Sequence, residues 1–316
     1  MRAAEGVNRR VTAVQRGPGP VRHRRPWRRA IPITVEDRQI DGPHGTIGVR
    51  VYAPDGEAGA GLVWAHGGAF YGGDIDMPES DWVARQLAER GIAVVAVDYR
   101  LAPVPEWSGD ETPVNRAERS YYPIASDEVT AAFRWATTSD ARVPFWAIGG
   151  ASAGAALTAG ASLRLRDNGQ PLPGAVVLVY PVVHAELPPM ADELASKVRT
   201  LPDPDAVGAA AVRRMNLHYV REPAAVREPY AFPGGHDLTG LPPTFILNAD
   251  IDSLRASGQQ YGAELAVAGV DVIMIREDGT RHGHLNEAGN ARAILSVHRI
   301  ADWLLSPTLL GAVHRR

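Results

Sequence analysis

The chain of 316 residues contains no cysteine. Disulfides, thiolate nucleophiles and cysteine-ligated zinc sites are therefore excluded. No apolar run approaches the ~20 residues that a membrane-spanning helix needs, so we expect no membrane association. The HExxH spacing of a helical zinc site is also missing, and we expect no metal. The formal net charge of −3 is too small to imply a charged partner.

The basic residues are concentrated at the N-terminus. Residues 1–30 contain nine arginines and three prolines but a single acid, Glu5. This composition predicts a solvated arm that precedes one large domain at 31–316. The alternative is that the arm forms part of a cap over that domain. Arg9 and Arg10 are followed by no apolar stretch or small-residue cleavage site, so we expect a cytoplasmic protein. We do not expect the arm to bind nucleic acid.

Hydrophobic patterning predicts alternating strands and helices, which is typical of the α/β class with a mostly parallel sheet. We expect a hairpin over 34–52, buried strands over 61–65, 92–97, 145–149, 174–180, 243–249 and 270–275, and helices over 77–90, 126–137, 153–166, 254–268 and 288–305. Residues 184–241 interrupt the alternation and are predicted to be helical only around 206–220. We expect this insertion to form a cap over the end of the sheet.

Ser152 lies where the strand over 145–149 turns into the next helix. Gly150 and Gly154 stand two residues to either side of it, and only small neighbours allow a turn sharp enough to expose the hydroxyl. Such a serine is a candidate nucleophile. A serine that merely caps a glycine-rich helix start would give the same pattern, so the surrounding residues must decide.

Active sites of parallel sheets lie beyond the carboxyl ends of the strands. A serine nucleophile needs an imidazole to take its proton, and the imidazole needs a carboxylate on its other nitrogen. Asp250 and Asp252 follow the strand over 243–249, while His282 and His284 follow the last strand. The chain order of serine, acid and histidine is therefore complete, and the residues alone leave two choices for the acid and two for the base.

The loop 66–73 is too rich in glycine to be an ordinary connection, which indicates that a ligand approaches its backbone. We expect the N–H groups of Gly68 and Ala69, together with that of Ala153 after the serine, to bind the oxyanion of an acyl-transfer reaction. Gly67 is expected to let the loop bend against the substrate.

Three aromatic residues are close to these donors along the chain. Phe70 and Tyr71 follow the glycines directly, and Tyr180 ends the strand beside that of the serine. We expect them to line and narrow the substrate pocket, which would favour acetyl to hexanoyl groups over longer acyl chains.

Several motifs together resemble the hormone-sensitive lipase family of α/β-hydrolases, which includes the bacterial family IV esterases. The motifs are HGG at 66–68, DYRLAP at 98–103, GxSxG at 150–154, LPP at 241–243 and HGH at 282–284. The resemblance covers about residues 35–305. It implies an α/β-hydrolase fold, with an eight-stranded sheet, helices on both faces and a cap built from the N-terminal segment and the insertion.

The same resemblance implies a triad of Ser152, Asp252 and His282. Asp252 begins a DSLR run similar to the DPLR of the family, and the family places its base at the histidine before the glycine. His284 stands where the family has an aromatic residue, and we expect it to line the pocket. Ala69 and Ala151 replace a glycine and an acid, and residues 106–121 look like an insertion at the substrate mouth.

We therefore expect a serine carboxylic ester hydrolase that acts on small-molecule esters of short to medium acyl chains, through an acyl-enzyme and without a cofactor. An amide deacetylase or a lactonase with the same triad is the alternative, because pocket shape rather than the triad separates these activities. A catalytically inactive binding protein is a third reading, which the presence of both serine and histidine disfavours. A homodimer is left open.

Overall fold

The computed structural model describes residues 30–109, 119–140, 142–203 and 206–313. The N-terminal arm lies outside the described residues except for Ala30, so its role stays a prediction. Within these ranges, no helix is long and apolar enough to cross a membrane.

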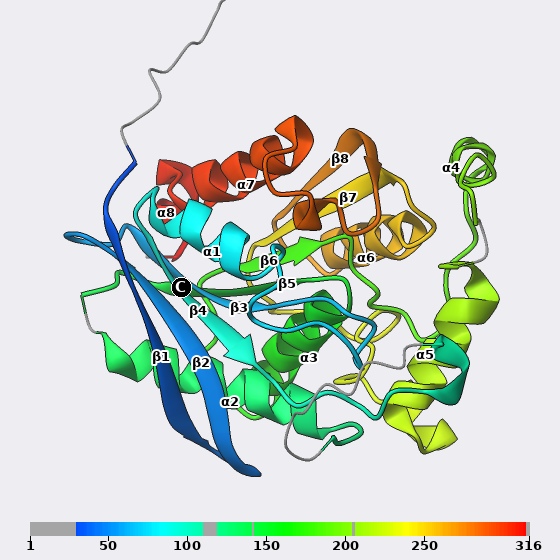
Figure 1. Ribbon diagram of the computed structural model, residues 1–316, viewed down its shortest axis with the longest axis horizontal. Coiled ribbons are helices and arrows are strands. Elements are labelled where there is room, and N and C mark those ends of the chain that lie inside the picture. The colour runs from blue at the N-terminus through cyan, green and yellow to red at the C-terminus, as the bar shows by residue number, and fades with distance from the viewer. Residues whose placement is uncertain (1–29, 110–118, 141, 204–205, 314–316) are drawn as a thin grey trace, which may run out of the picture.

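One sheet of eight strands forms the centre of the molecule, in the order β1-β2-β4-β3-β5-β6-β7-β8 (Figure 1). Its strands are β1 (Ile33–Gly42), β2 (Gly45–Pro54), β3 (Ala60–Ala65), β4 (Ile92–Asp98), β5 (Trp146–Ala151), β6 (Val176–Val179), β7 (Thr244–Ile251) and β8 (Val272–Arg281). β1 and β2 form an antiparallel hairpin, and β2 pairs antiparallel with β4. The remaining pairs are parallel. The predicted eight-stranded, mostly parallel sheet is confirmed.

Helices cover both faces of this sheet because its central strands are apolar on both sides. The helices are α1 (Asp81–Ala88), α2 (Ile124–Ser139), α3 (Ala153–Asp167), α4 (Asp192–Val198), α5 (Ala209–Val220), α6 (Arg255–Val267), α7 (Ala291–Leu304) and α8 (Pro307–Val313), with short 3₁₀ turns η1 (Glu106–Ser108), η2 (Pro223–Arg227) and η3 (His284–Asn286). Leu62 and Val94 pack toward α1, α7 and α8, whereas the next residues, Val63 and Val95, pack toward α2, α3 and α6.

The structure differs from the predicted elements at several places, among them α8, a helix after α7 that the sequence did not predict. β8 continues to Arg281 instead of ending at 275, because no apolar residue follows Ile275 in this edge strand and the extension therefore gives no apolar signal. α1 begins at Asp81 instead of 77. The prediction that 184–241 is helical only around 206–220 is wrong, because α4 also forms there. Only Leu194 and Val198 of α4 are buried, and one apolar pair is too few to show a helical period.

The segment between β6 and β7 carries α4, α5 and η2. Figure 1 shows α4 and α5 on the right, where the parallel strands end, with η1 beside α5. Charged groups attach α4 to the sheet. Lys197 lies 2.6 Å from Asp250 at the end of β7, and Glu193 of the same helix pairs with Arg255 at the start of α6.

Candidate active site

Ser152 lies between β5 and α3 in a backbone conformation that few residues adopt. Its φ is 52° and its ψ is −116°, and its N–H donates a 2.9 Å hydrogen bond to the carbonyl of Val179 on β6. A Cβ on Gly154 would come within 2.2 Å of the carbonyl oxygen of Ala65, and one on Gly150 within 2.5 Å of the carbonyl carbon of Gly154. Both positions therefore require glycine, as the sequence predicted for this turn.

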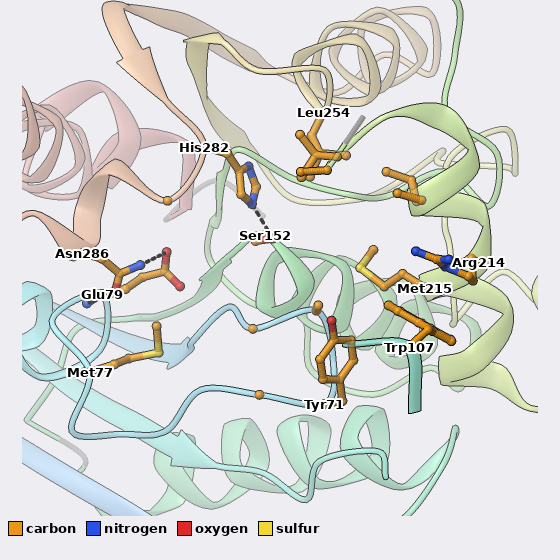
Figure 2. A pocket seen from close by; sticks show the side chains of 18 residues that line it. Tyr71, Met77, Glu79, Trp107, Ser152, Arg214, Met215, Leu254, His282 and Asn286 are labelled. Atoms are coloured by element: carbon orange, nitrogen blue, oxygen red, sulfur yellow. Dashed lines mark hydrogen bonds between the residues drawn. The ribbon is translucent and has the colours of Figure 1, made fainter. Parts of the chain in front are cut away.

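His282 follows β8 directly and faces Ser152 (Figure 2). Its Nε2 lies 2.9 Å from Oγ of Ser152, and its Nδ1 lies 2.8 Å from Oδ2 of Asp252. Asp252 is fully buried, and its Oδ1 accepts a 3.0 Å hydrogen bond from the N–H of Leu254. A carboxylate on Nδ1 keeps that nitrogen protonated, so Nε2 is left as the acceptor for the serine proton.

The pKa of His282 reflects opposing influences. Burial, the largest of them, lowers the pKa, but the charge and hydrogen bond of Asp252 and the charge of Glu79 outweigh it, and the pKa lies above its ordinary value. The imidazolium that forms when His282 takes a proton is therefore stabilised by nearby negative charge.

Asp250, the other acid at the end of β7, is held by different partners. Its carboxylate lies 2.6 Å from Lys197 and 3.2 Å from Arg255, and it accepts a 3.0 Å hydrogen bond from the N–H of Gly279. The contact with the histidine is made by Asp252. The spacing left both acids open, and this geometry favours Asp252.

His284, the other histidine, is a core residue. It is 2% exposed, its Nε2 lies 2.9 Å from Oγ of Ser296, and its ring meets the edge of Tyr180. Burial lowers the pKa of His284 to about 4, so the ring is neutral at physiological pH. The hydrogen bond of His284 is to Ser296, whereas His282 contacts Ser152. The geometry therefore favours His282 as the partner of Ser152.

The loop after β3 places three consecutive residues in the left-handed region, with φ values of 122° at Gly68, 56° at Ala69 and 69° at Phe70. A Cβ at Gly68 would lie 2.0 Å from the carbonyl oxygen of Gly72, so no larger residue fits there. Within the described part of the chain, the N–H groups of Gly68, Ala69 and Ala153 donate to no protein acceptor. They are available to donate to a bound oxygen.

A buried carboxylate, that of Glu79, supports this loop from behind. Glu79 is 2% exposed, and its Oε1 accepts a 2.6 Å hydrogen bond from the N–H of Gly67. Oε2 accepts hydrogen bonds from the hydroxyl of Tyr180 and, at 3.4 Å, from the side chain of Asn286. Burial raises the pKa of Glu79, and the hydrogen bonds from Tyr180 and Gly67 and the charge of His282 oppose that shift. No sequence pattern singled out Glu79, which was predicted to belong to an ordinary helix over 77–90.

A cavity of about 480 Å³ opens beside Ser152. Figure 2 shows Glu79 and Asn286 on one side of it and the side chains of η1 and α5 on the other. The residues that line it are Gly68, Ala69, Tyr71, Gly72, Met77, Glu79, Trp107, Ser152, Ala206, Val207, Ala211, Val212, Arg214, Met215, Leu254, His282, Gly283 and Asn286.

Of the residues predicted to form the substrate pocket, Tyr71 lines the cavity, and the prediction needs correction for the other four. Phe70 is buried and stacks at 4.0 Å on an aromatic ring of α5. Tyr180 is buried against Glu79, and His284 lies in the core for the reasons above. The N–H of Gly67 points to Glu79 behind the loop. Each position follows from contacts with residues distant in sequence, which local spacing does not show.

The far wall of the cavity comes largely from residues that the sequence did not single out. Arg214 and Met215 belong to α5, and Leu254 precedes α6. Trp107 lies in the stretch 106–121 that the sequence placed at the substrate mouth, and it does line the cavity. The helical pattern of α5 does not reveal which of its faces meets a cavity.

Comparison with known proteins gives matches over most of the chain. Residues 62–109 and 115–286 match a family model described as alpha/beta hydrolase fold. The chain is 34% identical over 269 residues to Esterase LipI of Mycobacterium tuberculosis, which covers 81% of this chain and 77% of the relative. It is 32% identical over 266 residues to Carboxylesterase NlhH of the same organism, with 81% and 77% covered.

Solved structures give the same picture. The esterase of Pyrobaculum calidifontis superposes with a TM-score of 0.74 at 32% identity, over 88% of this chain and 87% of that one. A thermostable esterase from Pseudomonas putida superposes with a TM-score of 0.71 at 25% identity, over 86% and 82%.

Proposed function

Since the chain belongs to the hormone-sensitive lipase-like esterases of the α/β-hydrolase fold, we propose that it hydrolyses small carboxylic esters through an acyl-enzyme at Ser152. This is the family that its motifs predicted. The main support for the mechanism is the continuous path from Oγ of Ser152 through His282 to Asp252, with contacts of 2.9 and 2.8 Å. These three residues form the proposed catalytic triad.

The proposed reaction moves one proton back and forth on His282. Oγ of Ser152 bonds to the ester carbonyl carbon while Nε2 of His282 takes the hydroxyl proton. The proton then passes to the leaving alkoxide as its bond to the acyl carbon breaks, and the acyl group remains on Ser152. Water, deprotonated by His282, attacks the acyl-enzyme and releases the carboxylic acid, and the proton returns to Ser152. Asp252 orients the ring and stabilises the imidazolium in both steps.

The N–H groups of Gly68, Ala69 and Ala153 form the proposed oxyanion hole. Negative charge develops on the carbonyl oxygen when Ser152 attacks, and donors already aimed at that position need no reorganisation during the reaction. The free amides and the steric constraint at Gly68 support this role.

We propose acyl groups from acetyl to hexanoyl as the best substrates, with turnover falling beyond octanoyl. Each methylene that fits adds up to about 0.8 kcal/mol of binding, until the chain meets a wall. Bulky side chains of Trp107 and Met215 limit the cavity on the side away from His282 (Figure 2), and Leu254 also lines it. The segment 184–241, which supplies part of this wall, is the proposed cap.

The test is a series of p-nitrophenyl acetate, butyrate, octanoate and palmitate, with kcat/KM measured for the wild type and for Ser152→Ala. The variant keeps the backbone and should lose at least about 10⁴-fold in kcat with an unchanged circular dichroism spectrum. Near-wild-type activity of Ser152→Ala would refute the proposed nucleophile. A maximum at palmitate would refute the proposed chain-length limit.

Amide deacetylase or lactonase chemistry would use the same three side chains, and no contact in the site favours either over ester hydrolysis. From the sequence alone, we propose that the enzyme works in the cytoplasm.

A further inference from the structure

Arg214 supplies the one guanidinium among the residues that line the described cavity, and no lysine lines it. It belongs to α5, and its guanidinium carbon lies 4.2 Å from the centre of the Trp107 ring. Figure 2 shows Arg214 on the side of the cavity opposite Glu79, next to Met215 and Trp107. A permanent positive charge therefore faces the space in which the substrate must lie.

Arg214 has no carboxylate partner among the described residues. The neighbouring Arg213, by contrast, lies 2.8 Å from Glu186 and does not line the cavity. A guanidinium stacked on an aromatic face is oriented by the ring, while the N–H groups at its edge remain able to donate. The contact with Trp107 therefore holds Arg214 in place without using up its hydrogen-bond donors.

The rest of the cavity separates this cation from the reacting atoms by apolar surface. Val212 and Met215, which belong to the same helix as Arg214, line the cavity, and Leu254 lines it as well. The single carboxylate of the lining, that of Glu79, lies across the cavity and is occupied by the N–H of Gly67 and by Asn286. A substrate anion near Arg214 would thus be attracted by the cation and would lie on the side of the cavity opposite the carboxylate.

We propose that the preferred substrates are esters that carry a second, anionic group, a carboxylate or a sulfonate, at the end of an apolar spacer, and that Arg214 binds this group. The inference rests on the proposed ester hydrolysis and specifies its substrate class. A planar guanidinium donates two parallel hydrogen bonds to a carboxylate or sulfonate, which gives both affinity and orientation. Because Arg214 is exposed, water and salt weaken the attraction, and we expect an effect of about tenfold rather than a larger one.

The experiment compares an anionic ester with a neutral ester of similar shape. Two such pairs are used, because the anion could lie on the acyl side or on the alcohol side of the scissile bond. Ethyl hydrogen adipate and ethyl hexanoate form the acyl-side pair, with acid release followed by chromatography. 4-Acetoxybenzenesulfonate and 4-acetoxybenzenesulfonamide form the alcohol-side pair. The measured quantity is the ratio of kcat/KM for the anionic ester to that for its neutral partner, in the wild type and in Arg214→Gln, Arg214→Lys and Arg213→Gln.

We expect Arg214→Gln to lower this ratio about tenfold for at least one pair, with Arg214→Lys in between because it keeps the charge but not the planar donors. Arg213→Gln is the matched control from the same helix and should leave the ratio unchanged. Added salt should lower the ratio in the wild type but not in Arg214→Gln.

Unchanged ratios in Arg214→Gln for both pairs would overturn the inference, as would an equal loss in Arg213→Gln, which would indicate a general charge effect. Hydrolysis of the neutral esters by the wild type would leave the proposed function standing in either case. Failure to hydrolyse any of the four esters would refute both proposals.

Discussion

The N–H of Gly67 donates a 2.6 Å hydrogen bond to the buried carboxylate of Glu79, so the loop that carries the proposed oxyanion donors is held by an anion on its protein side. The same carboxylate accepts from Tyr180 and from Asn286. Its charge also acts on His282 and raises the pKa of that histidine. Glu79 is thus a positioning residue for both the loop and the base.

Glu79→Gln should lower kcat about tenfold, because one donor to the carboxylate loses its partner and the loop shifts. The loss of negative charge should also lower the pKa of His282 and move the acid limb of the kcat/KM profile to lower pH. Glu186→Gln is the control, because Glu186 is an exposed glutamate whose one ion pair among the described residues is with Arg213. A merely structural role for Glu79 would change stability and leave the acid limb in place.

The pH dependence of the wild type should reflect the raised pKa of His282. The base must be neutral to accept a proton, so kcat/KM should rise with pH through an apparent pKa above the ordinary value of about 6.5. Asp252→Asn removes the main influence that raises the pKa, and should shift this limb to lower pH while reducing the rate. Profiles from pH 5 to 9 with p-nitrophenyl butyrate test both statements, and a flat wild-type profile would contradict them.

His284→Ala should reduce stability rather than substrate affinity. It removes a buried ring that is bonded to Ser296, and leaves that hydroxyl without its partner. We expect the free energy of unfolding to fall by about 1–3 kcal/mol, measured by urea denaturation, with little change in KM. His282→Ala should instead remove nearly all turnover. An increased KM with unchanged stability in His284→Ala would contradict this prediction and would indicate that His284 contacts the substrate.

Gly68→Val should displace the oxyanion donors, because even a Cβ at this position meets the carbonyl of Gly72 at 2.0 Å and the φ of 122° disfavours any side chain. Loss of one donor costs about 3 kcal/mol, or roughly 10²-fold in kcat, with a smaller change in KM. Gly56→Val is the matched control, since Gly56 also has a positive φ, of 97°, but nothing within 4 Å. Equal kcat losses in the two variants would rule out a specific effect at the loop.

The parts of this molecule that the sequence predicted well are those that depend on neighbours along the chain. Apolar runs gave the parallel strands, and the polar residues at their ends, Ser152, Asp252 and His282, meet because such ends share one edge of a sheet. The turn that carries Ser152 also needs glycine at two fixed positions, Gly150 and Gly154, and both are visible in the sequence.

Other residues depend on partners that are far away along the chain. Glu79 is buried because Asn286, 207 positions later, and Tyr180 reach it. Phe70 looked like a pocket residue because it follows the glycines, but the positive φ of 69° turns the chain there, and its ring packs against α5. No local period carries such information, so the sequence indicates which polar residues follow the strands but not which side chains line the cavity.

The cavity is lined by two parts of the fold that differ in how well they tolerate amino-acid substitutions. Ser152 stands at the end of β5, where a Cβ on Gly150 or Gly154 would come within 2.5 Å of the backbone, so these two positions leave no room for variation. Trp107, Arg214 and Met215 come from η1 and α5, outside the sheet. Random mutagenesis restricted to these two segments should therefore redirect the enzyme to new esters with little loss of folded protein, which makes them the natural place to begin directed evolution.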